Sequence, residues 1–138
     1  MFSNHKLVGA IVLIGVGVLM WSNHHGPVTP WQIVGALIAL PSGMLWMVAR
    51  LQLGQSFAVR AEARQLVTTG LYSKIRNPIY VFGLLFITGI FIYLGHFLWL
   101  WVVPALAALQ YWRVRAESAV LEAKFGDEYR QYRARTWF

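Results

Sequence analysis

The stretch that decides the fold is PIYVFGLLFITGIFIYL, residues 78–94. It contains no charged residue, and at about 1.5 Å of rise per residue it predicts a helix about 25 Å long. Another uncharged run, residues 97–112, follows after only Gly95 and His96. Two such runs joined by so short a turn predict a pair of transmembrane helices, which fit a bilayer by thinning it or by extending into the flanking turns.

Two further apolar runs precede this pair, at residues 7–21 and 31–49, with Pro41 inside the second. Of the 138 residues, 58% are hydrophobic and only 12% are charged, whereas about a quarter of a soluble domain is normally charged. This composition excludes a soluble globule. We expect an all-α integral membrane bundle forming a single domain, residues 1–138, with about four transmembrane helices and further cytoplasmic helices at its C-terminal end. The absence of cysteine excludes disulfides and a thiol nucleophile.

The charged residues all fall on one side of this map. Lys6 precedes the first run, five basic residues lie between the second and third runs, and six follow the fourth: Arg50, Arg60, Arg64, Lys74, Arg76, Arg113, Arg115, Lys124, Arg130, Arg133 and Arg135. Because basic residues accumulate on the cytoplasmic side of membrane proteins, we expect both termini to be cytoplasmic. The net charge of +7 is then a topology signal, and no nucleic-acid partner is expected.

Side chains that are able to hydrogen-bond a ligand concentrate in the two regions expected to be cytoplasmic, residues 50–77 and 113–138. A purely structural interpretation stays open for each of them. Asn77 and Pro78 suit the start of a helix, Tyr72 and Tyr80 suit a membrane interface, and a pair such as Arg113 and Glu117 suits an exposed helix face. The four histidines have no carboxylates near them in the sequence, so no metal site is expected.

Three motifs nevertheless occur in a familiar combination. They are LVTTGLY at 66–72, RNPIY at 76–80, and a helix that carries Arg113 and Glu117 and continues into FGDEYRQY at 125–132. Together they resemble the isoprenylcysteine carboxyl methyltransferase and phospholipid methyltransferase family, over roughly residues 53–132. Asn77 stands where many members have His. Asparagine permits hydrogen bonding but supplies no protonatable imidazole. Ser118 replaces the second acid of a common Glu-Glu pair.

This resemblance implies a membrane enzyme that binds S-adenosylmethionine at the cytoplasmic end of the bundle and releases S-adenosylhomocysteine. Arg113 matches an arginine near the methyl acceptor. The positions that match cofactor-binding residues are Arg64, Gln65, Leu66, Val67, Tyr72, Asn77, Pro78, Ile79, Tyr80 and Glu117.

The expected function is methyl transfer from S-adenosylmethionine to a lipophilic acceptor that enters from the membrane lipids. The acceptor stays open between a prenylcysteine carboxylate, a phospholipid amine and a small hydrophobic thiol, and so does the oligomeric state. The alternative is a non-catalytic four-helix membrane protein with a basic, lipid-binding tail.

Overall fold

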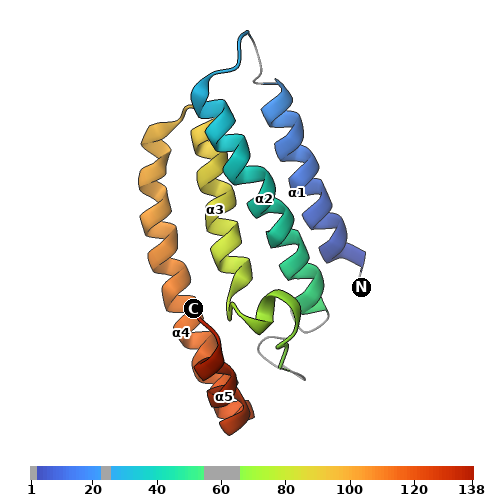
Figure 1. Cartoon of the computed structure of the whole chain (residues 1–138), viewed down its shortest axis with the longest axis vertical. Coiled ribbons are helices and arrows are strands. Elements are labelled where there is room, and N and C mark those ends of the chain that lie inside the picture. The colour runs from blue at the N-terminus through green and yellow to red at the C-terminus, as the bar shows by residue number, and fades with distance from the viewer. Residues whose placement is uncertain (1–2, 23–25, 55–65) are drawn as a thin grey trace.

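The computed structural model describes residues 3–22, 26–54 and 66–138 of the chain (Figure 1). These residues form five α-helices and two short 3-10 helices, η3 and η4, and they contain no β-strand. The elements are α1 (Ser3–Ser22), α2 (Pro30–Leu53), η3 (Gly70–Ser73), α3 (Pro78–Tyr93), η4 (Phe97–Trp101), α4 (Val102–Phe125) and α5 (Asp127–Arg135). The expected all-α architecture is confirmed.

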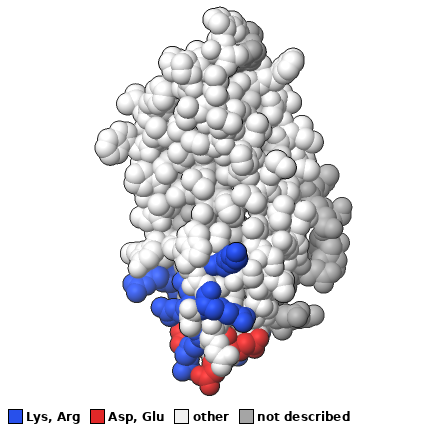
Figure 2. All heavy atoms as spheres, in the orientation of Figure 1, with Lys and Arg blue, Asp and Glu red and all other residues white. Residues whose placement is uncertain are grey.

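Helices α1 to α4 lie side by side and alternate in direction, and α5 folds back along the last turns of α4 (Figure 1). The start of α1, the end of α2, the start of α3 and the end of α4 therefore lie at the same end of the bundle. Lys and Arg side chains gather at this end, whereas the other described side chains on the visible face are uncharged, apart from the Asp and Glu side chains at the same end (Figure 2). The separation of charge that the sequence predicts is thus present in three dimensions.

Among the described residues, two helical stretches are long and apolar enough to cross a membrane: α2 and the continuous stretch Phe97–Phe125, which combines η4 and α4. The apolar parts of α1 and α3, Gly9–Trp21 and Pro78–Tyr93, are shorter. Large apolar side chains cover the outside of the bundle, among them Leu37 and Leu98, which are 69% and 84% exposed. Such a surface suits contact with lipid. The expectation of four spans stays a prediction for α1 and α3.

The most extensive packing joins α2 to α3 through small residues. Gly35 and Ala39, one turn apart on α2, face Gly89 on α3. A Cβ added at Gly35 would lie 2.3 Å from the backbone nitrogen of Tyr93, and one added at Gly89 would lie 2.6 Å from the backbone nitrogen of Ala39. Small residues let two membrane helices approach this closely, so this seam fixes how α2 and α3 pair.

The charged end is closed by contacts between segments that are distant in the sequence. The Tyr72 hydroxyl of η3 donates to the carbonyl oxygen of Ala49 (3.3 Å), and the Tyr132 hydroxyl of α5 donates to the carbonyl oxygen of Tyr72 (2.7 Å). The backbone N–H of Asn77 donates to the carbonyl oxygen of Phe138 (2.9 Å). These bonds hold α5 and the residues after it against the start of α3.

Candidate functional site

A cavity of about 530 Å³ lies between α1, α2, α3 and α4, where the apolar part of the bundle meets the charged end. We call it the central cavity. Its polar lining residues are Tyr80, Gln110, Arg113 and Glu117, and its apolar ones are Val12, Trp46, Ile79, Gly83, Phe86 and Ile87. Apolar walls with a few converging polar groups are typical of small-molecule sites.

Glu117 is the acidic group of the central cavity, and Tyr80 holds it. The Tyr80 hydroxyl donates to Oε1 of Glu117 at 2.6 Å. The guanidinium carbon of Arg113 lies 5.8 Å from the centroid of the Tyr80 ring, within cation–π range. Because Gln110, Arg113 and Glu117 are spaced by three and four residues, α4 presents all three on one face.

Asn77 and Pro78 lie at the start of α3, as the sequence predicts, and both are buried. The Asn77 side chain, however, makes no capping hydrogen bond. Its Nδ2 is enclosed by protein and has no hydrogen-bond partner among the described residues. Leaving a buried amide donor unpaired costs free energy, so this donor suits an acceptor atom supplied by a ligand. A helix cap alone therefore does not explain why Asn77 stands at this position.

The structure brings four of the expected site residues together in the central cavity: Ile79, Tyr80, Arg113 and Glu117. Tyr72 does not line this cavity and forms a buried cluster with Ala49 and Leu53. Val67 packs against that cluster, as does Ile79. Leu66 is half-buried at the start of the last described segment, whereas Arg64 and Gln65 lie outside the described residues. Contact between any of the expected site residues and a cofactor stays a prediction.

Two polar residues that the sequence analysis did not single out stand out in the structure, one in the central cavity and one on α5. Gln110 lines the central cavity, and its spacing from Arg113 and Glu117 along the helix was the available signal. Tyr129 of α5 is completely buried, and its hydroxyl has no hydrogen-bond partner among the described residues. Within the same residues, no group of three or more His, Asp or Glu side chains is placed to hold a metal ion.

Part of this sequence is similar to known proteins. A family model described as phospholipid methyltransferase matches residues 30–128. Protein-S-isoprenylcysteine O-methyltransferase of Schizosaccharomyces pombe is 37% identical over 95 residues, which cover 62% of this chain and 39% of the relative. The chain thus spans about two fifths of the length of this curated relative. No solved structure matches the chain significantly. With more than half of its residues matched, the chain belongs to the phospholipid methyltransferase family.

Proposed function

We propose that this protein transfers a methyl group from S-adenosylmethionine to a lipophilic acceptor at the cytoplasmic surface of a membrane. The family and the name of the relative point to methyl transfer. The observation that carries the proposal is the central cavity, in which a carboxylate, a phenol and a guanidinium group converge beneath apolar walls.

The residues present fit the chemical groups of S-adenosylmethionine. A carboxylate such as Glu117 pairs with the ammonium group of its methionine part, and an aromatic face such as that of Tyr80 attracts a sulfonium. The enclosed Nδ2 of Asn77 is a donor available to a cofactor oxygen or nitrogen. When bound, the cofactor supplies a methyl group activated by positive sulfur, which requires no covalent intermediate with the protein.

The protein's part in such a reaction is to position the acceptor and to keep water out. The apolar walls of the central cavity hold a hydrophobic body, and the Arg113 guanidinium orients an anionic group by charge-assisted hydrogen bonds. Alignment and desolvation of this kind lower the barrier to a displacement reaction. A carboxylate acceptor is already ionised at neutral pH and needs no general base. This favours a prenylcysteine carboxylate over a phospholipid amine or a thiol.

The same proposal includes four membrane spans with both termini on the cytoplasmic side. It is supported by the alternating directions of α1 to α4 and by the gathering of charge at one end. The chain has no cysteine, so single cysteines report sidedness cleanly. We expect Val28→Cys and Ser73→Cys to be labelled from opposite sides of sealed vesicles. Labelling of both from the same side would contradict the topology.

Methyl transfer is tested with the purified full chain and radiolabelled S-adenosylmethionine. We expect label to enter a farnesylated cysteine derivative with a free carboxylate and not its methyl ester, because the ester has no acceptor oxygen left. Label that enters phosphatidylethanolamine instead would keep the enzyme class and correct the acceptor. No transfer to any of the three acceptor classes would favour the non-catalytic alternative.

A further inference from the structure

A second hollow, of about 350 Å³, lies on another flank of α4, beneath α5. It has no lining residue in common with the central cavity. Its charged lining residues are Arg76, which precedes α3, Arg115 and Glu122 of α4, and Arg133 of α5. We call it the basic pocket. Its charged residues are therefore separate from the polar residues of the central cavity.

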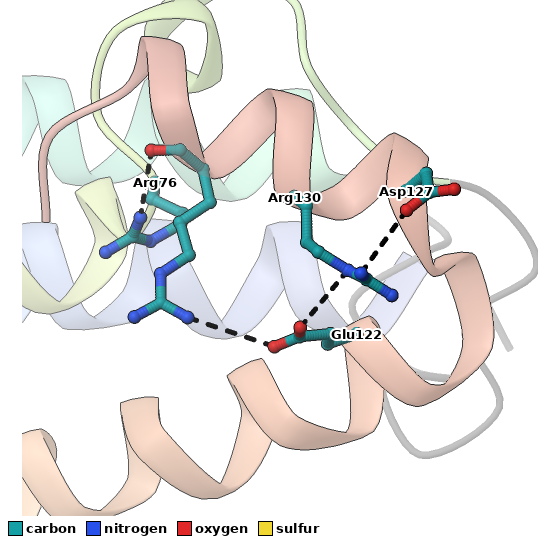
Figure 3. Close-up of polar contacts among 5 residues, drawn as sticks. Arg76, Glu122, Asp127 and Arg130 are labelled. Atoms are coloured by element: carbon teal, nitrogen blue, oxygen red, sulfur yellow. Dashed lines mark hydrogen bonds and ion pairs between the residues drawn. The ribbon is translucent and has the colours of Figure 1, made fainter.

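Positive side chains outnumber negative ones in the basic pocket, because three guanidinium groups face one side-chain carboxylate. That carboxylate, Glu122, is already engaged: its Oε1 lies 3.4 Å from Nε of Arg130, and its Oε2 lies 3.8 Å from Nη1 of Arg133 (Figure 3). Within the described part of the chain, neither Arg76 nor Arg115 has a carboxylate at ion-pair distance. The pocket therefore retains uncompensated positive charge.

The arginines of the basic pocket come from segments that are far apart in the sequence but held together. Nη1 of Arg76 makes a long hydrogen bond of 3.5 Å to the carbonyl oxygen of Arg133 (Figure 3). The Arg115 guanidinium lies 5.4 Å from the ring centroid of Tyr111, one turn earlier on α4. Each arginine thus has a neighbour that restricts it, and the positive groups are arranged before any ligand arrives.

The basic pocket lies where the charged end of α4 meets its apolar outer surface. Tyr111, which lines the pocket, is 48% exposed, its neighbour Trp112 is 78% exposed, and Trp101 further along the apolar part is 80% exposed. An acyl chain can lie along this surface while its headgroup reaches the arginines. A ligand with one anionic end and a long apolar body matches both features.

We propose that the basic pocket binds the phosphate of an anionic membrane phospholipid, with the acyl chains lying along α4. Guanidinium groups bind phosphate oxygens in paired, charge-assisted hydrogen bonds, and basic pockets between membrane helices bind anionic headgroups. A lipid bound here joins the segment before α3 to α4 and α5. The proposal does not rest on methyl transfer, and its test needs no activity.

The test is native mass spectrometry of the purified full chain in detergent with added phosphatidylglycerol or phosphatidylcholine. We expect the wild-type chain to retain phosphatidylglycerol in preference to phosphatidylcholine. Arg115→Gln should lower phosphatidylglycerol retention about fivefold, the worth of one basic group near a membrane surface. The matched control is Lys124→Gln, which removes one positive charge from an exposed position on the same helix outside the pocket, and it should retain the lipid like the wild type.

Four results would overturn the proposal. Equal retention of the two lipids, or equal loss in the two variants, would show that no specific headgroup site exists. Displacement of the lipid by millimolar inorganic phosphate would assign the pocket to a soluble anion. Displacement by S-adenosylhomocysteine would make the pocket part of the cofactor site. Because Arg115 is exposed on α4, its substitution leaves the fold intact, which circular dichroism of the variant checks.

Discussion

Two flanks of the same helix, α4, carry the same residue types in different surroundings. On the first flank Glu117 accepts a hydrogen bond from a tyrosine and faces the apolar central cavity. On the second flank Glu122 pairs with arginines that are about 60% exposed. Exposed ion pairs contribute little free energy, whereas charges shielded from water interact strongly. The glutamate of the central cavity is thus distinguished by its hydrogen bond to Tyr80 and by its apolar surroundings, whereas the basic pocket is distinguished by its excess of positive charge.

The largest expected effect separates the two glutamates directly. Glu117→Ala should weaken binding of S-adenosylhomocysteine about ten- to a hundredfold, since a charge-assisted contact is worth roughly 1.5 to 3 kcal/mol. Glu122→Ala, on the other flank, should bind it like the wild type. Isothermal titration calorimetry in detergent measures both. Equal affinities of the two variants would remove Glu117 from the cofactor site.

The wall of the central cavity depends on the α2–α3 seam, whereas the outer face of α1 is open. Gly35→Ala should lower the free energy of unfolding by about 1–3 kcal/mol, the usual cost of overpacking, because its Cβ would collide with the backbone of Tyr93. A Cβ at Gly17 meets nothing within 4 Å, so Gly17→Ala should be neutral or slightly stabilising. Unfolding in denaturing detergent compares the variants. Equal stability would show that the seam is looser than described.

Arg113 distinguishes a binding role from simple anchoring at the membrane surface. A lysine anchors at an interface as well as an arginine does, but it lacks the planar, two-pronged geometry that fits a carboxylate. Arg113→Lys should therefore lower kcat/KM for the acceptor about tenfold and leave the affinity for S-adenosylhomocysteine unchanged. The control Arg135→Lys makes the same exchange on α5. Unchanged kcat/KM in Arg113→Lys would return this residue to an anchoring role.

The smallest expected effect concerns Asn77. Asn77→Asp keeps the size of the side chain and places a carboxylate at the start of α3, where a helix tolerates negative charge. Because Asn77 is buried and its side chain makes no capping bond, a carboxylate there should lower the stability. The enclosed N–H donor is also lost, so affinity of the folded protein for S-adenosylhomocysteine should fall about two- to tenfold. Thermal unfolding and calorimetry of the same sample separate the two effects. Normal cofactor affinity would make Asn77 a residue of the helix start alone.

The sequence was sufficient for features that depend on local pattern. The charge-free run at 78–94 predicted α3, the charge distribution predicted one charged end, and the helix that runs through Arg113 to residue 125 ends where Gly126 adopts a positive φ of 54°. Arg113 and Glu117 were expected on one face because they are four residues apart. That Tyr80 belongs to the same site was implied only by the family resemblance, since spacing along one helix gives no information about a residue on another helix.

Features that depend on contacts between distant segments were not predictable in this way. The pairing of Asn77 with Phe138 joins residues more than 60 positions apart, and nothing local signals it. The same holds for Tyr72, whose ring packs under α2 while its carbonyl group accepts a bond from Tyr132. Gln110 was overlooked because a single uncharged polar residue leaves an apolar run intact, although the run continues directly into Arg113.

The most direct test of the central claim is a calorimetric titration of the purified, full-length chain in detergent with S-adenosylhomocysteine alone. The claim is that the Glu117 flank of α4 forms a cofactor site within a folded bundle. It predicts saturable, stoichiometric binding that needs no acceptor and persists in high salt, because Glu117 is partly buried and hydrogen-bonded and such a group is screened less than a surface charge. A chain that is fully helical by circular dichroism and yet releases no binding heat, and shows no binding by equilibrium dialysis, would contradict it.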